Sequence, residues 1–301
     1  MKKKIGSYTL LLAALTLFGS CKKNNLDDYE AAKDVDATKT QVRFIHAFSS
    51  NTINTVSPVT ITTAPPAFAF HVNGVRLNGV VTPTTSPSWL TFYFGAFPGV
   101  NTASPTTNGS NGSLNTGGVA ASTILPDYAV LPGGTMRVAA VLNRFTGASP
   151  ADTVIANTVT LDNGKRYTLI AGDTIPNQRF FVFEDNWTRP APGNYQIRII
   201  NMAPAITHAA FDVFSRRQAR TIATNVAYRS GTNYAEFPVR GTLDLTNDTL
   251  EFRPAGTPTT VVQFNGFFPV SERVYTFVVR GLSNLPTTNV RTLAVAGYLN
   301  R

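Results

Sequence analysis

Apolar and polar residues alternate with a period of two in several short stretches of this chain, the pattern typical of half-buried β-strands. Strands are predicted at 41–48, 67–72, 135–142, 153–161, 166–171 and 179–184. In the third of these, every second side chain is apolar and would line one face: Met136, Val138, Ala140 and Leu142. No comparable stretch keeps helical spacing over three turns. The pattern therefore predicts an all-β protein, a sandwich or barrel rather than alternating helices and strands.

The second half of the chain repeats the strand pattern of the first half. Residues 42–47 read Val-Arg-Phe-Ile-His-Ala, and residues 197–202 read Ile-Arg-Ile-Ile-Asn-Met. Further matched pairs follow in the same order: 70–72 with 211–213, 128–132 with 234–238, and 166–169 with 274–277. The offset between matched segments falls from 155 residues to 106, so the first copy carries an insertion of roughly 49 residues.

These repeats predict two tandem immunoglobulin-like β-sandwich domains, residues 41–187 and 195–301. The insertion, at about residues 75–122, is rich in Gly, Ser, Thr and Asn, a composition typical of a loop. A proline-containing linker, 188–194, separates the two domains. Residues 21–40 are polar and predict a flexible tether before the first domain.

Residues 1–20 have the pattern of a signal peptide. Three lysines at 2–4 precede an apolar run at 8–18, too short to cross a bilayer of roughly 30 Å as a helix. Two small residues then precede Cys21, the only cysteine, and this order resembles the lipobox of bacterial lipoproteins. The resemblance implies acylation of Cys21 and a lipid anchor in the cell envelope, at the outer membrane on its periplasmic or surface face. One cysteine supports no intramolecular disulfide and no metal cluster.

Acidic residues shortly after Cys21 bear on the face of the membrane. Residues 27–30 read Asp-Asp-Tyr-Glu and resemble the export signal of surface lipoproteins of Bacteroidota. An ordinary solvated linker explains the same residues equally well.

The distribution of basic residues along the chain argues against a nucleic-acid partner. The net charge is +9 at pH 7, and residues 195–301 contain eleven arginines, no lysine and six acids. These arginines are spread along the predicted strands and are not interleaved with aromatic residues, as a nucleic-acid platform requires. We expect them on solvated strand faces and edges, where charge opposes aggregation.

No motif predicts catalysis. The sequence has no Gly-x-Ser-x-Gly elbow. His46 falls on the core side of its predicted strand, and Asn201 takes its place in the second repeat, so we expect a structural hydrogen-bonding role. Glu184 and Asp185 are adjacent on a strand and point to opposite faces, which makes them poor partners for paired-carboxylate hydrolysis. We expect no enzyme, no cofactor and no metal.

Aromatic residues give the one positive indication of binding. Tyr93 is predicted to point outward from the aromatic stretch 89–97, and Trp187 follows Glu-Asp-Asn at 184–186. Exposed rings stack on sugars while Asn and Asp bind hydroxyl groups, although core packing also explains such rings. Separately, three Asp-Thr-apolar triplets resemble the O-glycosylation acceptor of Bacteroidota, and the acceptors would be Thr153, Thr174 and Thr249.

The repeated opening strand resembles the family named domain of unknown function 4397. Its opening pattern Val-Arg-apolar-apolar-His-Ala is present at 42–47, and its second-strand Asp-Val is present at 212–213. Neither repeat keeps both polar positions, because the first has His71 for the Asp and the second has Asn201 for the His. The resemblance implies an immunoglobulin-like sandwich and no established activity.

These observations predict a lipid-anchored protein of the cell envelope that acts as a non-enzymatic binding or adhesion module. Its expected partners are the membrane, through the lipid, and glycans or other envelope proteins. The alternative is a glycan-binding or glycan-processing accessory enzyme in polysaccharide use.

Overall fold

The computed structural model describes residues 35–48, 68–77, 96–97, 113–114, 128–142, 153–174, 177–205, 208–239, 247–284 and 292–300. Residues Ala37–Arg301 form one compact unit. In the described ranges the regular structure is β throughout, so the predicted all-β fold is confirmed. Within these ranges there is no helix long and apolar enough to cross a membrane.

The strands of the two halves follow the repeat seen in the sequence. The first half contains β1 (Thr40–Phe48), β2 (Phe68–Val72), β3 (Val75–Arg76), β4 (Ala96–Phe97), β5 (Ser113–Leu114), β6 (Ala129–Leu131), β7 (Gly134–Leu142), β8 (Thr153–Leu161), β9 (Arg166–Asp173) and β10 (Arg179–Glu184). The second half contains β11 (Asn194–Asn201), β12 (Ala210–Ser215), β13 (Arg220–Ala227), β14 (Ser230–Gly231), β15 (Ala235–Pro238), β16 (Asp248–Pro254), β17 (Val262–Phe267), β18 (Val274–Arg280) and β19 (Ala294–Leu299). Each predicted strand is present, with ends that differ from the prediction by two residues or fewer.

Each half is built from two sheets with the same strand order. Sheet I has the order β10-β9-β1, with β4 and β6 on the other edge of β1, and sheet II has the order β3-β2-β7-β8. Sheet III has the order β19-β18-β11, with β14 and β15 on the other edge of β11, and sheet IV has the order β13-β12-β16-β17. In addition, β5 from the first half pairs with the outer edge of β19.

Segments matched in the sequence repeat occupy equivalent positions in sheets I and III, with the same strand neighbours and the same register. In sheet I, β1 runs parallel to β9, and Val42 lies opposite Tyr167. In sheet III, β11 runs parallel to β18, and Ile197 lies opposite Tyr275. The register therefore defines counterparts in the two halves, which we use below.

The hairpin between β2 and β3 shows how local sequence fixes a turn. Asn73 and Gly74 have φ angles of 48° and 82°. Positive φ at both central residues is the requirement of a type I′ turn, which suits the twist of a two-residue hairpin and favours Asn-Gly. Val72 and Val75 consequently face each other across the hairpin.

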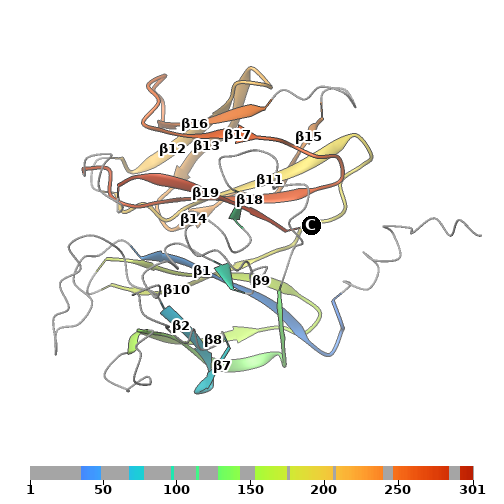
Figure 1. The fold of residues 1–301 in the computed structure, drawn as a ribbon, viewed down its shortest axis with the longest axis vertical. Coiled ribbons are helices and arrows are strands. Elements are labelled where there is room, and N and C mark those ends of the chain that lie inside the picture. Colours follow the sequence, from blue (N-terminus) through green and yellow to red (C-terminus); the bar gives the residue numbers. More distant parts are fainter. Residues whose placement is uncertain are drawn as a thin grey trace, which may run out of the picture. The chain divides into compact units, whose positions relative to one another are not determined.

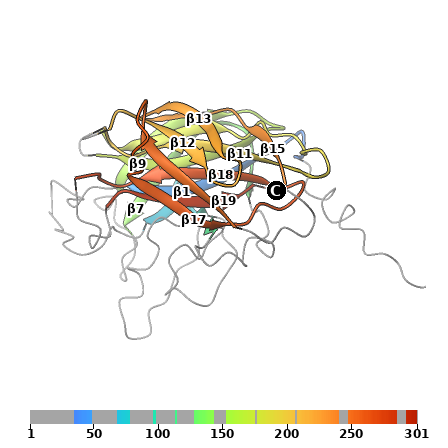
Figure 2. The same ribbon diagram turned by 90° about the horizontal axis from the view of Figure 1, so that it is seen from above.

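The core of each half lies between its two sheets. Phe44 and Phe70 lie in the first core with a centroid distance of 5.1 Å, and Phe264 and Phe277 lie in the second at the same distance. A third apolar cluster, the interface cluster, joins sheets I and III; it consists of Ile45, Ala47, Ile170, Phe181, Ile200, Met202, Val278, Ala296 and Tyr298. The sheets are therefore stacked in the order II, I, III, IV (Figure 1), and Figure 2 shows the same strands from above.

This stacking explains the composition of the central strands. Sheets I and III are covered on both faces, so β9, β11 and β18 are buried along almost their whole length. Strands covered on both faces have near-continuous apolar sequences, such as Val-Tyr-Thr-Phe-Val-Val in β18. The outer strand β12 instead alternates between buried and half-buried side chains over most of its length.

We expect the two sandwiches to unfold together in one transition. The interface cluster is almost fully buried and has the character of a domain core, whereas ordinary contacts between domains are more polar. Differential scanning calorimetry should show one endotherm, with calorimetric and van't Hoff enthalpies that agree. Two resolved endotherms would contradict this expectation.

Candidate functional site

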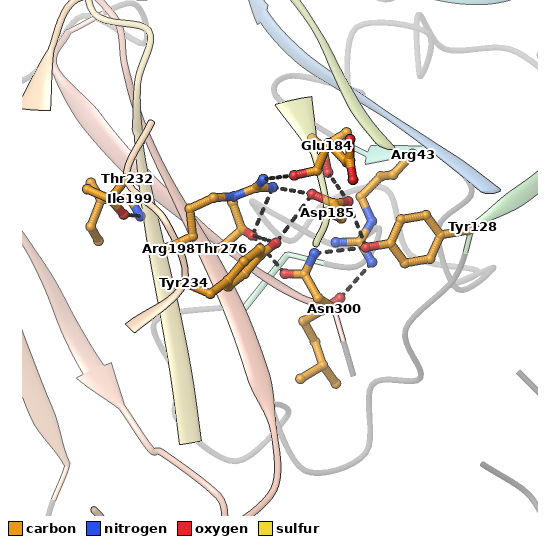
Figure 3. Close-up of polar contacts among 12 residues, drawn as sticks. Arg43, Tyr128, Glu184, Asp185, Arg198, Ile199, Thr232, Tyr234, Thr276 and Asn300 are labelled. Carbon is orange, nitrogen blue, oxygen red and sulfur yellow. Dashed lines mark hydrogen bonds and ion pairs between the residues drawn. The ribbon is translucent and has the colours of Figure 1, made fainter. Parts of the chain in front are cut away.

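Eight polar side chains meet between sheets I and III, beside the interface cluster. All of them except Thr168 are labelled in Figure 3. We call them the interface network: Arg43, Tyr128, Thr168 and Asp185 from the first half, and Arg198, Tyr234, Thr276 and Asn300 from the second. The strand register makes these four pairs counterparts of one another in the order given. The repeat thus places two copies of the same set face to face.

Asp185 is the only acidic member of the interface network. It follows directly after β10, and its side chain is completely buried. Its carboxylate forms an ion pair with Arg198 and accepts hydrogen bonds from Thr168 Oγ1 at 2.7 Å, Tyr128 OH at 2.8 Å and Tyr234 OH at 3.3 Å. A buried carboxylate is tolerated when a cation and hydrogen-bond donors surround it in this way.

The two arginines of the interface network each cross to the other half. Arg198 Nη1 donates to the carbonyl oxygen of Glu184 at 3.0 Å, and Arg43 Nη2 donates to that of Leu299 at 2.6 Å. Each guanidinium also lies over a tyrosine ring of its own half, with Cζ-to-centroid distances of 4.7 Å for Arg43 and 4.6 Å for Arg198. Burial alone would lower the pKa of Arg198, but the Asp185 carboxylate raises it, so the guanidinium stays charged.

Asn300 completes the link between the halves. Its Oδ1 accepts a hydrogen bond from Thr276 Oγ1 at 2.8 Å, and its Nδ2 donates to Tyr128 OH at 2.9 Å. Burial, reinforced by the Asp185 charge, raises the pKa of Tyr128 to about 12, so its hydroxyl keeps the proton that it donates to Asp185. The chain of hydrogen bonds therefore runs without a break from Thr276 to the Asp185 carboxylate.

The expectation that the arginines of residues 195–301 lie on solvated faces is wrong for Arg198, which is 3% exposed, and its counterpart Arg43 is buried to the same extent. The physical reason is that β1 and β11 are central strands of sheets I and III and are covered on both faces, so Arg43 and Arg198 point into the interface between the two sheets. A signal for this was present in the sequence. Both arginines interrupt apolar runs, Val-Arg-Phe-Ile and Ile-Arg-Ile-Ile, which is the pattern of a strand buried on both faces.

The histidine and asparagine at equivalent places on β1 and β11 are buried. His46 is 2% exposed, and Asn201 is fully buried. Asn201 Nδ2 donates to the carbonyl oxygen of Val226 at 3.0 Å, and its Oδ1 accepts from the amide of Ala203 at 3.0 Å. The Asn201 amide thus satisfies backbone groups. In the described part of the chain, no group of three His, Cys, Asp or Glu side chains is arranged to hold a metal ion.

Of the residues predicted to bind lipid or sugar, only Trp187 is described, because Cys21 and Tyr93 lie outside the described residues. Trp187 is half-buried, and the guanidinium of Arg166 lies over its ring at 4.3 Å from the centroid. Arg166 Nε also donates to Gln41 Oε1 at 3.2 Å. One face of the indole is therefore covered, and a sugar would have to meet its remaining edge or face.

The structure does not bring the three predicted O-glycosylation acceptors together. Thr153 begins β8, Thr174 follows β9 and Thr249 lies in β16, and all three are half-buried. The aspartates that precede two of them are buried and engaged, since Asp173 accepts the Thr174 amide hydrogen at 2.7 Å and Asp248 accepts from Ser215 Oγ at 2.5 Å. The residue before Thr153 lies outside the described residues.

A separate charged cluster lies on the outer face of sheet IV. Glu251 accepts hydrogen bonds from Arg216, Arg253 and Thr260. Burial alone would raise the pKa of Glu251, but these hydrogen bonds outweigh it and lower the pKa to about 2.

This lowered pKa predicts how the contribution of Glu251 to stability depends on pH. A carboxyl group with a lower pKa in the folded state stabilises the protein above its unfolded pKa of about 4.3, and that contribution is lost as the pH falls toward about 2. Urea unfolding at several pH values should show that wild type is more stable than Glu251→Gln near pH 6. The difference should shrink steadily between pH 5 and pH 2. A difference that is constant over this range would contradict the assignment.

Comparisons with known proteins give one family match. The family model described as "Domain of unknown function (DUF4397)" matches residues 96–209. No curated protein matches the chain. Among solved structures, the chain is similar to the Bacillus anthracis TIE protein, with 10% identity and a TM-score of 0.19 over 81% of this chain and 34% of that one. It is also similar to a leucine-rich repeat protein from Bacteroides thetaiotaomicron VPI-5482, with 10% identity and a TM-score of 0.15 over 85% of this chain and 26% of that one.

The chain thus spans about a third and a quarter of the lengths of these two proteins. The family match begins at β4 and ends at the residue before β12, so it includes β11 but neither of the segments on which the resemblance was based, 42–47 and 212–213. The predicted resemblance to the DUF4397 family is confirmed for residues 96–209.

Proposed function

We propose that this chain is a non-enzymatic binding or adhesion module held in the cell envelope by a lipid on Cys21. The observation that carries the proposal is that the charged groups of the interface network link the two halves of the chain. Its carboxylate and its two guanidinium groups are turned inward and are engaged with groups that link the two halves. A catalytic acid or base must reach its substrate, whereas these groups hold two sandwiches in one compact unit. A compact pair of sandwiches suits the presentation of loops and outer sheet faces to a partner.

The lipid anchor rests on the order of residues before Cys21. A cleaved and acylated Cys21 would hold the protein at the membrane, because each buried methylene of the acyl chains contributes about 0.8 kcal/mol to partition. Mass spectrometry of the membrane-extracted protein should find an N-terminal acylated cysteine. The variant Cys21→Ser should appear in the soluble fraction. An unmodified leader that is still attached would refute the anchor.

Adhesion and sugar binding can be separated with the folded unit. Residues 37–301, produced without the leader, should bind cells or envelope extracts, and a glycan array should decide whether the ligand is a sugar. If it is, Tyr93→Ala and Trp187→Ala should weaken binding, while Val130→Ala, at a 60% exposed position outside the predicted insertion, should not. Release of sugar fragments from a bound polysaccharide would favour the accessory enzyme instead. Absence of binding to cells, extracts and glycans would refute the module.

A further inference from the structure

The interface between the two halves has approximate two-fold symmetry. Glu184 lies opposite Tyr167, and Leu299 lies opposite Tyr275, so these two residues are counterparts. Arg198 donates to the carbonyl of Glu184, and its counterpart Arg43 donates to the carbonyl of Leu299. A contact that is repeated in this reciprocal way is the mark of an isologous interface, the kind found in two-fold symmetric dimers.

The residues at equivalent positions are nevertheless unlike in charge. Asp185 and Asp173 belong to the first half, and they form ion pairs with Arg198 and Arg229 of the second half. The counterparts of the two aspartates are neutral. By the strand register, the residue equivalent to Asp185 in the second half is Asn300, and the residue equivalent to Asp173 is Gly281. Two first halves in this geometry would place the Asp185 of one half at the position of Asn300, on the same tyrosine hydroxyl as the Asp185 of the other half, and would so bring two carboxylates together.

The equivalent positions are also unlike in size. Met202 of the second half packs against Gly172 of the first, and its Cε lies 2.9 Å from the place that a Cβ on Gly172 would occupy. Their counterparts are Ala47 and Arg280. Pairing of two second halves would set Met202 against Arg280, and pairing of two first halves would leave a gap between Ala47 and Gly172.

We propose that this face is a specificity interface that accepts only unlike halves, with Asp185 and Asn300 as the residues that determine the pairing. The network needs one carboxylate and one carboxamide, because the single proton of Tyr128 OH goes to Asp185 while the Tyr128 oxygen accepts from Asn300 Nδ2. The two-fold relation further implies that the carboxylate can be moved to the other half. Arg43 would then take the place of Arg198 as its cation, and Tyr234 OH would donate to residue 300. This proposal is independent of the proposed function.

Three full-length variants test the proposal by thermal unfolding. Asp185→Asn makes the pair alike as amides and leaves Arg198 without its carboxylate, so we expect the Tm to fall by about 10 °C. Asn300→Asp makes the pair alike as carboxylates that share one tyrosine proton, and we expect a clear fall in Tm here as well. The double exchange Asp185→Asn/Asn300→Asp restores an unlike pair and should recover at least half of the loss seen in Asp185→Asn.

Either of two results would overturn the proposal. The first is an Asn300→Asp variant that is as stable as wild type or more stable, because two carboxylates would then be accepted. The second is a double exchange that is no more stable than Asp185→Asn. The carboxylate would then be required at residue 185 itself, and an unlike pair of residues at 185 and 300 would not be enough. If Asp185→Asn fails to fold, the comparison of Asn300→Asp with wild type and with the double exchange still decides the question.

Discussion

The variant Arg198→Met is expected to lower the free energy of unfolding by about 3–5 kcal/mol, as is usual when one partner of a buried ion pair is removed. The Asp185 carboxylate would remain completely buried and would keep only its hydrogen bonds from neutral hydroxyl groups. The carbonyl of Glu184 would also lose its donor. Methionine retains much of the length of the arginine side chain, so the change removes charge more than volume. Urea unfolding followed by circular dichroism would measure the effect.

The matched control is Arg43→Met, at the counterpart position in the same interface. Arg43 is buried to the same extent and donates to a neutral carbonyl, that of Leu299 at 2.6 Å. Its removal leaves Asp185 paired with Arg198, so we expect a smaller loss of about 1.5–3 kcal/mol, the usual range for a hydrogen bond with a charged group. If Arg43→Met costs as much as Arg198→Met, or more, then the ion pair is not the dominant interaction of the network.

The strands of this fold are readable from the sequence because local alternation determines them. Residues 153–161 and 179–184 were predicted with the bounds that β8 and β10 have, since a period of two and flanking turn residues are local signals. The matched segments 42–47 and 197–202 likewise take equivalent places in β1 and β11. A duplicated pattern predicts a duplicated topology because each copy must bury the same face.

The interface network was not readable in this way, because it depends on how two sheets meet. Alternation correctly separates Glu184 from Asp185, with Glu184 exposed and Asp185 buried, but it cannot say which strand covers the buried side. Arg198 is 13 residues from Asp185, and Asn300 is 172 residues from Tyr128. Contacts of this kind arise only when sheets I and III pack together. The apolar runs that Arg43 and Arg198 interrupt do indicate strands buried on both faces. Most arginines in proteins are exposed, however, and that general rule predicts the opposite.

The variant Phe277→Ala is expected to lower the free energy of unfolding by about 3–5 kcal/mol, because it leaves a cavity in the second core. Phe277 is fully buried in β18, and its ring makes T-shaped contacts with Phe264 and Phe267 at centroid distances of 5.1 and 5.0 Å. Such aromatic pairs add to the loss of buried area. The interface cluster joins this half to the other, so the midpoint of the single transition should fall for the whole unit.

A matched control removes the same ring from the outer face of sheet IV. Phe214 is half-buried, and its ring packs under the guanidinium of Arg253, with Cζ 4.1 Å from the centroid. Phe214→Ala opens no internal cavity, because solvent can reach the site, and it should cost only about 1–2 kcal/mol. Comparable losses in the two variants would show that Phe277 does not lie in a closely packed core. A loss in Phe277→Ala that affects only one of two separate transitions would show that the interface cluster does not couple the halves.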